Sequence, residues 1–113
     1  MIKKPRLGSY VYVITRDPFG SLDHCSIKQT KVLAKGQQLF FTELALNEIY
    51  TEEAKRPLKY NEYGEFWFTK FSDAKTKIGT MKCREGYKYE IKKCHAGKEF
   101  WWNIYLVRKN NND

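Results

Sequence analysis

Runs of hydrophobic residues, separated by short polar segments, predict three consecutive strands in the first half of the chain. The clearest run covers residues 9–15, where Tyr, Val and Ile dominate over the length of an ordinary strand. Pro18 and Gly20 then punctuate a turn or a longer loop, and further strands are predicted over 25–34 and 38–44. Because the strands follow one another without a crossover helix, we expect an antiparallel meander.

The middle of the chain combines helical and loop-like features. Apolar residues at helical spacing within 45–59 suggest a helix, but Pro57 stops any helix shortly after Lys55. We therefore expect one helical turn inside a loop, with residues 51–64 as its most mobile part. A short aromatic strand is predicted next, over 65–69.

A helix is predicted near residues 72–84. Ser72 can cap its first turn, and Asp73 places a negative charge near its amino end. Apolar residues then recur at helical spacing, at Ala74, Ile78 and Met81. Gly86 is expected to end the helix.

Two strands over 87–94 and 98–108, joined by a turn at 95–97, predict a C-terminal hairpin. Together these elements give a mainly β fold with one helix, a β-rich α+β fold. We expect a small antiparallel barrel or a bent sheet, of which the SH3-like barrel is the commonest example at this size, with the helix near 72–84 before the hairpin. An α+β sheet with one packed helix is the alternative.

Length and residue usage limit the organisation of the chain. Its 113 residues are too few for two separate cores, so we expect one domain over 1–113, with frayed ends at 1–7 and 109–113. No apolar run is long enough to cross a bilayer, and the start of the chain lacks the apolar stretch of a signal peptide. Three widely spaced cysteines are unlike a secreted disulfide framework, so we expect a cytoplasmic protein with reduced thiols.

The chain is basic throughout, with a net charge of +8 that divides into +3 for residues 1–56 and +5 for residues 57–113. Neither half is a separate basic tail. A basic excess spread over a folded domain favours a polyanionic partner, although many basic proteins bind no nucleic acid.

Cysteine and histidine residues supply suitable atoms for zinc, but their spacing is unsuitable. His24 and Cys25 are adjacent, as are Cys94 and His95, and neighbouring side chains diverge on an extended chain. Cys83 stands apart from both pairs. We expect the cysteines to pack as small hydrophobic residues, with no metal and no cofactor bound. Whether the five residues converge in space is left open.

The chain carries no motif of an enzyme class. It has no glycine-rich phosphate loop, no dinucleotide-binding fingerprint and no zinc-protease motif. No cysteine is marked as an activated nucleophile, and the paired carboxylates, such as Glu52 and Glu53, lie in a polar segment. We therefore predict a non-enzymatic protein. A hydrolase or metal enzyme built on the cysteines and histidines is the third class of function considered.

Aromatic residues are abundant enough to reach the surface. Seven Phe, eight Tyr and three Trp exceed what one small core encloses. If alternate residues of the last strand form the core, Trp101 and Tyr105 share the opposite face, near Lys88 and Lys92, with Lys93 as a further candidate. Stacking rings with phosphate-attracting charge are used to bind single-stranded nucleic acid. These five residues are the predicted nucleic-acid-binding site.

The alternative is that a helix, a loop or the far wall of a barrel covers both faces of this hairpin. The aromatic residues would then be core residues and the lysines a solvated rim, because paired aromatics are also ordinary stabilisers of sheets. The sequence pattern by itself does not show which face of the hairpin is buried.

Four segments carry a resemblance to a group of proteins. They are residues 11–14, residues 27–32, the strand 66–69 and the helix start 72–75. Over residues 8 to 80 this pattern resembles short uncharacterised accessory proteins of bacterial phages and mobile elements. The resemblance implies a small non-enzymatic binder that engages host nucleic-acid machinery or blocks a host defence complex, and it assigns no role to any residue.

The leading hypothesis is a binding module that contacts nucleic acid or a nucleoprotein complex through a basic, aromatic-bearing surface. The runner-up is a protein-interaction module, or an inhibitor of a host protein, whose exposed aromatics anchor an interface with an acidic partner surface. The sequence gives neither the base preference nor the oligomeric state.

Overall fold

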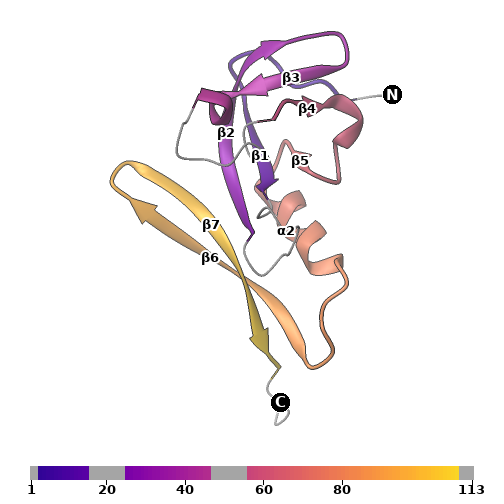
Figure 1. The fold of residues 1–113 in the computed structure, drawn as a ribbon, viewed down its shortest axis with the longest axis vertical. Coiled ribbons are helices and arrows are strands. Elements are labelled where there is room, and N and C mark those ends of the chain that lie inside the picture. The colour runs from indigo at the N-terminus through magenta and orange to yellow at the C-terminus, as the bar shows by residue number, and fades with distance from the viewer. Residues whose placement is uncertain (1–2, 16–24, 47–55, 110–113) are drawn as a thin grey trace.

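The structure is a computed structural model, and it describes residues 3–15, 25–46 and 56–109 (Figure 1). The described elements are mostly strands, with one α-helix among them. In chain order they are β1 (Tyr10–Thr15), β2 (Ser26–Lys35), β3 (Leu39–Thr42), the 3-10 turn η2 (Glu43–Leu46), β4 (Leu58–Lys59), the 3-10 turn η3 (Tyr60–Glu62), β5 (Trp67–Phe68), α2 (Phe71–Thr80), β6 (Tyr87–Ala96) and β7 (Glu99–Arg108).

The described strands form one curled antiparallel sheet, which confirms the predicted β-rich fold with one helix. Along the main path the strand order is β4-β3-β2-β1-β5, and β7 joins β2 to β6. The pairs β1–β2 and β2–β3 are antiparallel, as the meander prediction required. Figure 1 shows the sheet bent into a half-barrel, with the β6–β7 hairpin leaving it at an angle.

One core lies inside the curl of the sheet. Trp67 is fully buried at its centre, where its Nε1 donates a hydrogen bond to the Lys59 carbonyl at 2.9 Å. Its ring packs against Phe40 in a T-shaped arrangement, with ring centroids 4.9 Å apart. We call this the first core; its buried members are Val11, Val13, Val32, Phe40, Leu44, Leu58, Tyr60 and Trp67.

A second core lies on the other face of β1 and β2, beneath α2 and the hairpin. Successive side chains of a strand point to opposite faces, so Val13 enters the first core while Ile14 enters the second. Ile104 of β7 packs into the second core and is only 2% exposed. The buried members of the second core are Ile14, Cys25, Ile27, Phe68, Ala74, Ile78 and Ile104.

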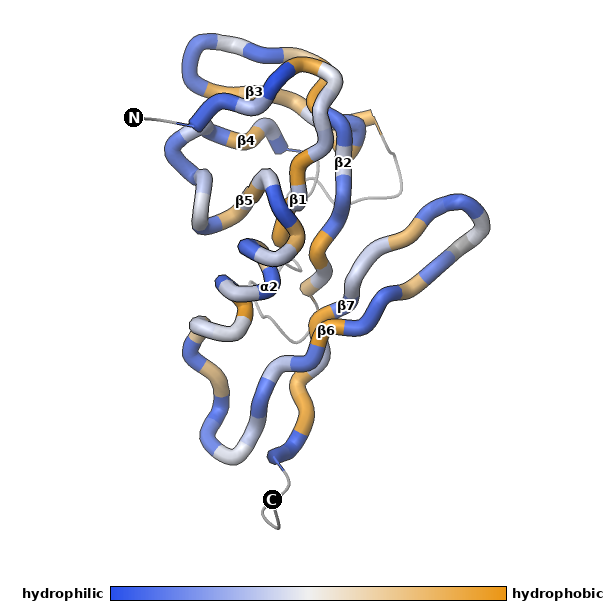
Figure 2. Tube along the Cα trace, turned by 180° about the vertical axis from the view of Figure 1, so that it is seen from behind, coloured by the Kyte–Doolittle hydropathy of each residue, from blue (hydrophilic) through white to orange (hydrophobic). Residues whose placement is uncertain are grey.

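The C-terminal hairpin is confirmed, and it is attached to the sheet over a short stretch. Strand β7 pairs with β2 only where Ile27 meets Trp102 and Ser26 meets Asn103. The Ile104 N–H also donates to the Cys25 carbonyl at 3.1 Å. Beyond this contact the end that carries the turn stands away from the half-barrel (Figure 1). Figure 2 shows hydrophobic positions where the hairpin crosses β2.

The helix prediction was right in place and wrong at both ends. Helix α2 begins at Phe71 with Lys70 as its N-cap, so Ser72 lies inside it. It ends at Thr80, because Met81 already has extended backbone angles. Met81 nevertheless packs against the second core. Met81 is apolar because it packs there, and it happens to lie at helical spacing from Ala74 and Ile78. The helical pattern therefore continued beyond the end of the helix.

In the part that the structure describes, the segment predicted as a mobile loop over 51–64 contains a two-residue strand as well as a turn. Residues 51–55 lie outside the described residues, but 56–64 hold β4 and η3. Leu58 and Tyr60 are buried in the first core, and the Tyr60 hydroxyl donates to the Gly36 carbonyl at 2.8 Å. Burial of two large side chains fixes a segment whose proline and charged residues are typical of a loop.

Three smaller corrections concern boundaries. The third strand stops at Thr42, whose hydroxyl accepts the Leu44 N–H at 3.3 Å and starts the turn η2. The strand predicted over 65–69 pairs only at Trp67 and Phe68. The hairpin turn falls at Gly97 and Lys98 rather than at 95–97. Gly97 has a φ of 64°, the left-handed angle that two-residue hairpin turns need.

Residues 3–7, predicted to be frayed together with 1–2, lie against the first core. Pro5 is buried, and the Lys4 Nζ sits 5.3 Å from the centroid of the Tyr60 ring. The Gly8 N–H then donates to the Val32 carbonyl at 2.8 Å. At the other end, the Lys109 N–H donates to the Gly86 carbonyl at 2.8 Å, and residues 110–113 lie outside the described residues.

An ion pair beside η3 should make folding stability depend on pH. The Glu62 carboxylate accepts two bonds from the Arg56 guanidinium, at 2.9 and 3.1 Å, and the Lys59 N–H at 2.8 Å. Partial burial alone would raise the pKa of Glu62, but these bonds outweigh it and hold the pKa below its usual value. The stabilisation is therefore complete above the unfolded pKa of 4.5 and is lost as the pH falls through the lower folded pKa.

Glu62→Gln should lower the free energy of unfolding at neutral pH, because glutamine keeps an oxygen for the Lys59 N–H but loses the charge facing Arg56. Urea titrations of both proteins at several pH values measure the difference. We expect the difference to shrink as the pH falls below 4.5 and Glu62 takes up a proton. A difference that stays constant over this range would contradict the assignment.

Candidate nucleic-acid interface

The two faces of the hairpin differ in what covers them. Cross-strand partners share a face, and Cys94 lies opposite Trp101 while Glu90 lies opposite Tyr105. On the inner face, Ile104 is buried in the second core and Trp102 packs against this core. We call the opposite side the outer face; its residues are Lys88, Glu90, Lys92, Cys94, Trp101, Asn103, Tyr105 and Val107.

Four of the five predicted site residues share the outer face. Tyr105 is 40% exposed, Trp101 is half-buried, and Lys88 and Lys92 are exposed. The Lys92 Nζ lies 5.7 Å from the centroid of the Tyr105 ring, within cation–π range. The structure thus brings two aromatic rings and two lysines together on one strip of the hairpin.

Lys93, the fifth predicted residue, lies on the inner face. It faces Trp102 across the strand pair, and its Nζ sits 4.7 Å from the centroid of the Phe100 ring. Lys92 and Lys93 are consecutive in β6, so their side chains point to opposite faces. Lys93 therefore cannot act on the same surface as Trp101 and Tyr105.

Lys28 of β2 completes the outer face and was missed by the sequence analysis. Its Nζ lies 5.5 Å from the centroid of the Trp101 ring, in the same arrangement as Lys92 over Tyr105. Burial lowers the pKa of Lys28, and the nearby Glu99 carboxylate partly opposes that shift. Only the pairing of β2 with β7 places Lys28 here, and no local pattern in β2 reports that pairing.

Polar contacts hold the centre of the outer face. The Asn103 Nδ2 donates to the Tyr105 hydroxyl at 3.3 Å and to the Cys94 Sγ at 3.3 Å. The Cys94 Sγ also lies 4.0 Å from the same hydroxyl. Asn103 therefore fixes the position of the Tyr105 phenol and reduces the conformational freedom that the ring would lose on binding.

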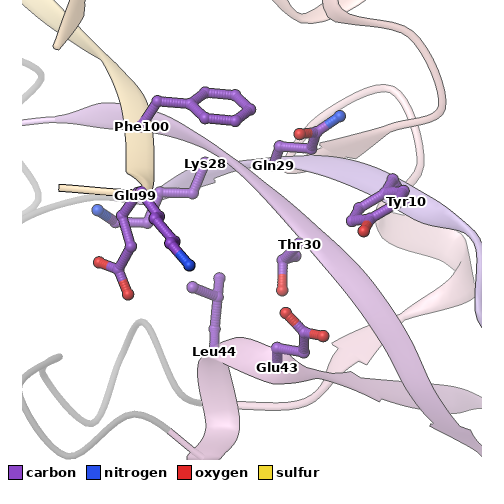
Figure 3. A pocket seen from close by; sticks show the side chains of 9 residues that line it. Tyr10, Lys28, Gln29, Thr30, Glu43, Leu44, Glu99 and Phe100 are labelled. Atoms are coloured by element: carbon purple, nitrogen blue, oxygen red, sulfur yellow. The ribbon is translucent and has the colours of Figure 1, made fainter. Parts of the chain in front are cut away.

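A pocket of about 300 Å³ opens where the hairpin separates from the sheet. Figure 3 shows Thr30 and Glu43 on one side of it and Lys28 and Glu99 on the other. The Thr30 hydroxyl is buried and has no hydrogen-bond partner among the described residues. Lys28 and Lys98 also line this pocket, and the carboxylates of Glu43 and Glu99 offset part of their charge.

The three cysteines considered as metal ligands or nucleophiles lie on separate segments of the described chain. Cys25 is buried immediately before β2, Cys94 lies on the hairpin, and Cys83 lies in the segment after α2. His24 falls outside the described residues. Among those described, no group of three or more Cys, His, Asp or Glu side chains could hold a metal ion, and no helix could span a membrane.

Comparisons with family models, with curated proteins and with solved structures return no match to this chain.

Proposed function

We propose that this protein is a non-enzymatic module that binds single-stranded nucleic acid through the outer face of the β6–β7 hairpin. The observation that carries the proposal is the repeated pairing of a ring with a lysine on that face: Lys28 over Trp101 and Lys92 over Tyr105. Each pair offers a π-face for a base and a cation for the adjacent phosphate.

The charge distribution supports the same surface. The β6–β7 hairpin, residues 87–108, holds five Lys or Arg against two Glu, so these 22 residues carry +3 of the net charge of +8. Trp101 and Tyr105 are four residues apart on one strand, which separates their side chains by about 13 Å. Two stacking platforms along a basic strip fit a flexible strand better than a rigid duplex, whose bases are already stacked.

The resemblance to accessory proteins of phages and mobile elements is consistent with this role and identifies no partner. A nucleoprotein complex that exposes a single strand would offer the same chemistry as the free strand.

The test is binding of a fluorescein-labelled oligothymidine of about 12 nucleotides, a length within the usual site size for such surfaces. Trp101→Ala should weaken binding about tenfold, because stacking on one aromatic ring contributes roughly 1–3 kcal/mol per base. Tyr105→Ala should act in the same direction. Fluorescence anisotropy gives the dissociation constants, and thermal unfolding shows whether each variant is folded.

Tyr10→Ala is the matched control. Tyr10 is 53% exposed and has the Lys31 Nζ 5.6 Å from its ring centroid, but it lies on β1 rather than on the hairpin. Its loss should leave oligonucleotide affinity unchanged. Equal losses for Tyr10→Ala and Trp101→Ala, or no binding by the wild-type protein at low salt, would refute the proposed function.

A further inference from the structure

Strand β6 has an open edge on the side away from β7. Among the described residues, β6 pairs with β7 and with no other strand. A two-residue turn at Gly97 and Lys98 is flanked by Ala96 and Glu99, which form a hydrogen-bonded pair in such hairpins. The bond from the Lys109 N–H to the Gly86 carbonyl belongs to the same alternating series.

The alternation fixes which backbone groups point outward. Ala96, Cys94 and every second residue before them in β6 form the backbone hydrogen bonds with β7. The N–H and C=O groups of Ile91, Lys93 and His95 then point away from β7. The bond from Ile104 to Cys25 shows the same alternation on β7, because Ile104 faces β2 and not β6. No backbone partner for Ile91, Lys93 or His95 occurs in residues 3–15, 25–46 or 56–109.

A groove runs beside this edge, between β6 and α2. It has a volume of about 370 Å³. Ile78, Tyr89 and Ile91 supply apolar lining, and Lys75 and Lys92 bring positive charge against the single carboxylate of Glu90. Gly79 of α2 also lines the groove, and a Cβ placed there would meet nothing within 4 Å. The groove can therefore accept an apolar side chain from outside.

We propose that an extended segment of a partner protein adds to the open edge of β6 as a further strand. Its apolar side chain enters the groove beside Gly79, and flanking Asp or Glu residues meet Lys75 and Lys92. Main-chain hydrogen bonds to Ile91 and Lys93 provide affinity, while the groove and the lysines select the sequence.

The lysines of β6 favour an acidic partner segment. Lysines on an edge strand discourage pairing with a neutral strand or with a second copy of the same basic strand. Two copies of β6 would bring Lys88, Lys92 and Lys93 of one molecule against those of the other. An acidic segment reverses the sign of that interaction.

Gly79→Leu is the decisive variant. It fills the groove from the helix side, where the space is open, and replaces the least favourable helix residue after proline. The variant should therefore fold at least as well as the wild-type protein. Because it occupies the space of an incoming apolar residue, it should weaken segment binding about tenfold or more.

The probe is a display library of random peptides of about seven residues, selected on the full chain, and the selected peptides are then tested on Gly79→Leu. We expect enriched peptides with alternating apolar positions and several Asp or Glu residues. Selected peptides should slow amide exchange at Ile91 and Lys93, and Lys75→Glu should weaken their binding. Enrichment of basic or patternless peptides, no enrichment, or unchanged exchange at β6 would overturn the proposal.

This inference does not rest on the proposed nucleic-acid function. Lys92 belongs to both surfaces, but two variants that leave Lys92 unchanged test them separately. Trp101→Ala should leave peptide binding unchanged, because Trp101 lies on β7 and does not line the groove. Gly79→Leu should leave oligonucleotide binding unchanged, since α2 contributes nothing to the outer face. If Gly79→Leu has no effect on the selected peptides, the groove is not their site.

Discussion

Trp67→Ala should remove about 3–5 kcal/mol from the free energy of unfolding, as expected for truncating a fully buried aromatic residue. Trp67 is the largest side chain that is completely buried, and it contacts both Phe40 and Tyr63 edge-on. Alanine leaves a cavity at the centre of the first core. It also leaves the Lys59 carbonyl without its 2.9 Å bond from the indole nitrogen.

Urea unfolding followed by far-ultraviolet circular dichroism measures this loss. A small domain has a total stability of about 5–15 kcal/mol, so the variant should unfold at a much lower denaturant concentration or fail to fold. Trp101→Ala is the control, because the same substitution on the outer face removes a half-buried ring and creates no internal cavity. Equal losses for the two variants would contradict the assignment of Trp67 to the core.

The sequence predicted the hairpin well because its determinants are local. Alternation with a period of two, two aromatic-rich strands and a glycine near the turn all lie within residues 87–108. The same alternation correctly grouped Trp101 with Tyr105 and Lys88 with Lys92. Applied strictly, it would also have assigned Lys93 to the opposite face.

The errors in the fold arose where tertiary packing decided the local structure. Pro57 and its charged neighbours predict a loop, but burial of Leu58 and Tyr60 fixes that segment against the first core. Met81 satisfies a helical period, yet it reaches the second core from extended backbone after α2 has ended. Neither outcome can be obtained from the neighbouring residues alone.

The composition of the outer face was predictable only in part for the same reason. Lys28 is placed over Trp101 by the pairing of Ile27 with Trp102, which joins two strands far apart in the sequence. The open edge of β6 likewise depends on a long-range pairing, because the second neighbour of β7 is β2. Long-range strand pairing leaves little trace in the composition of either strand.

Oligonucleotide affinity should fall about fiftyfold between about 50 and about 200 mM salt. The estimate assumes that four lysines on or beside the outer face, Lys28, Lys88, Lys92 and Lys98, each neutralise one phosphate. For single strands the slope of log affinity against log salt is about −0.7 per phosphate, which gives about −2.8 in total. Anisotropy titrations of the oligothymidine at several salt concentrations measure this slope.

Substitutions should separate the electrostatic contribution of the lysines from the stacking contribution of the rings. The double variant Lys88→Gln, Lys92→Gln should make the slope shallower by about 1.4, because two counterion-releasing contacts are lost. Trp101→Ala should reduce affinity by a similar factor at every salt concentration and leave the slope unchanged, since stacking releases no counterions. A wild-type slope near zero, together with weaker binding by Trp101→Ala, would show that the rings bind without the lysines. That result would contradict the proposed role of each ring–lysine pair.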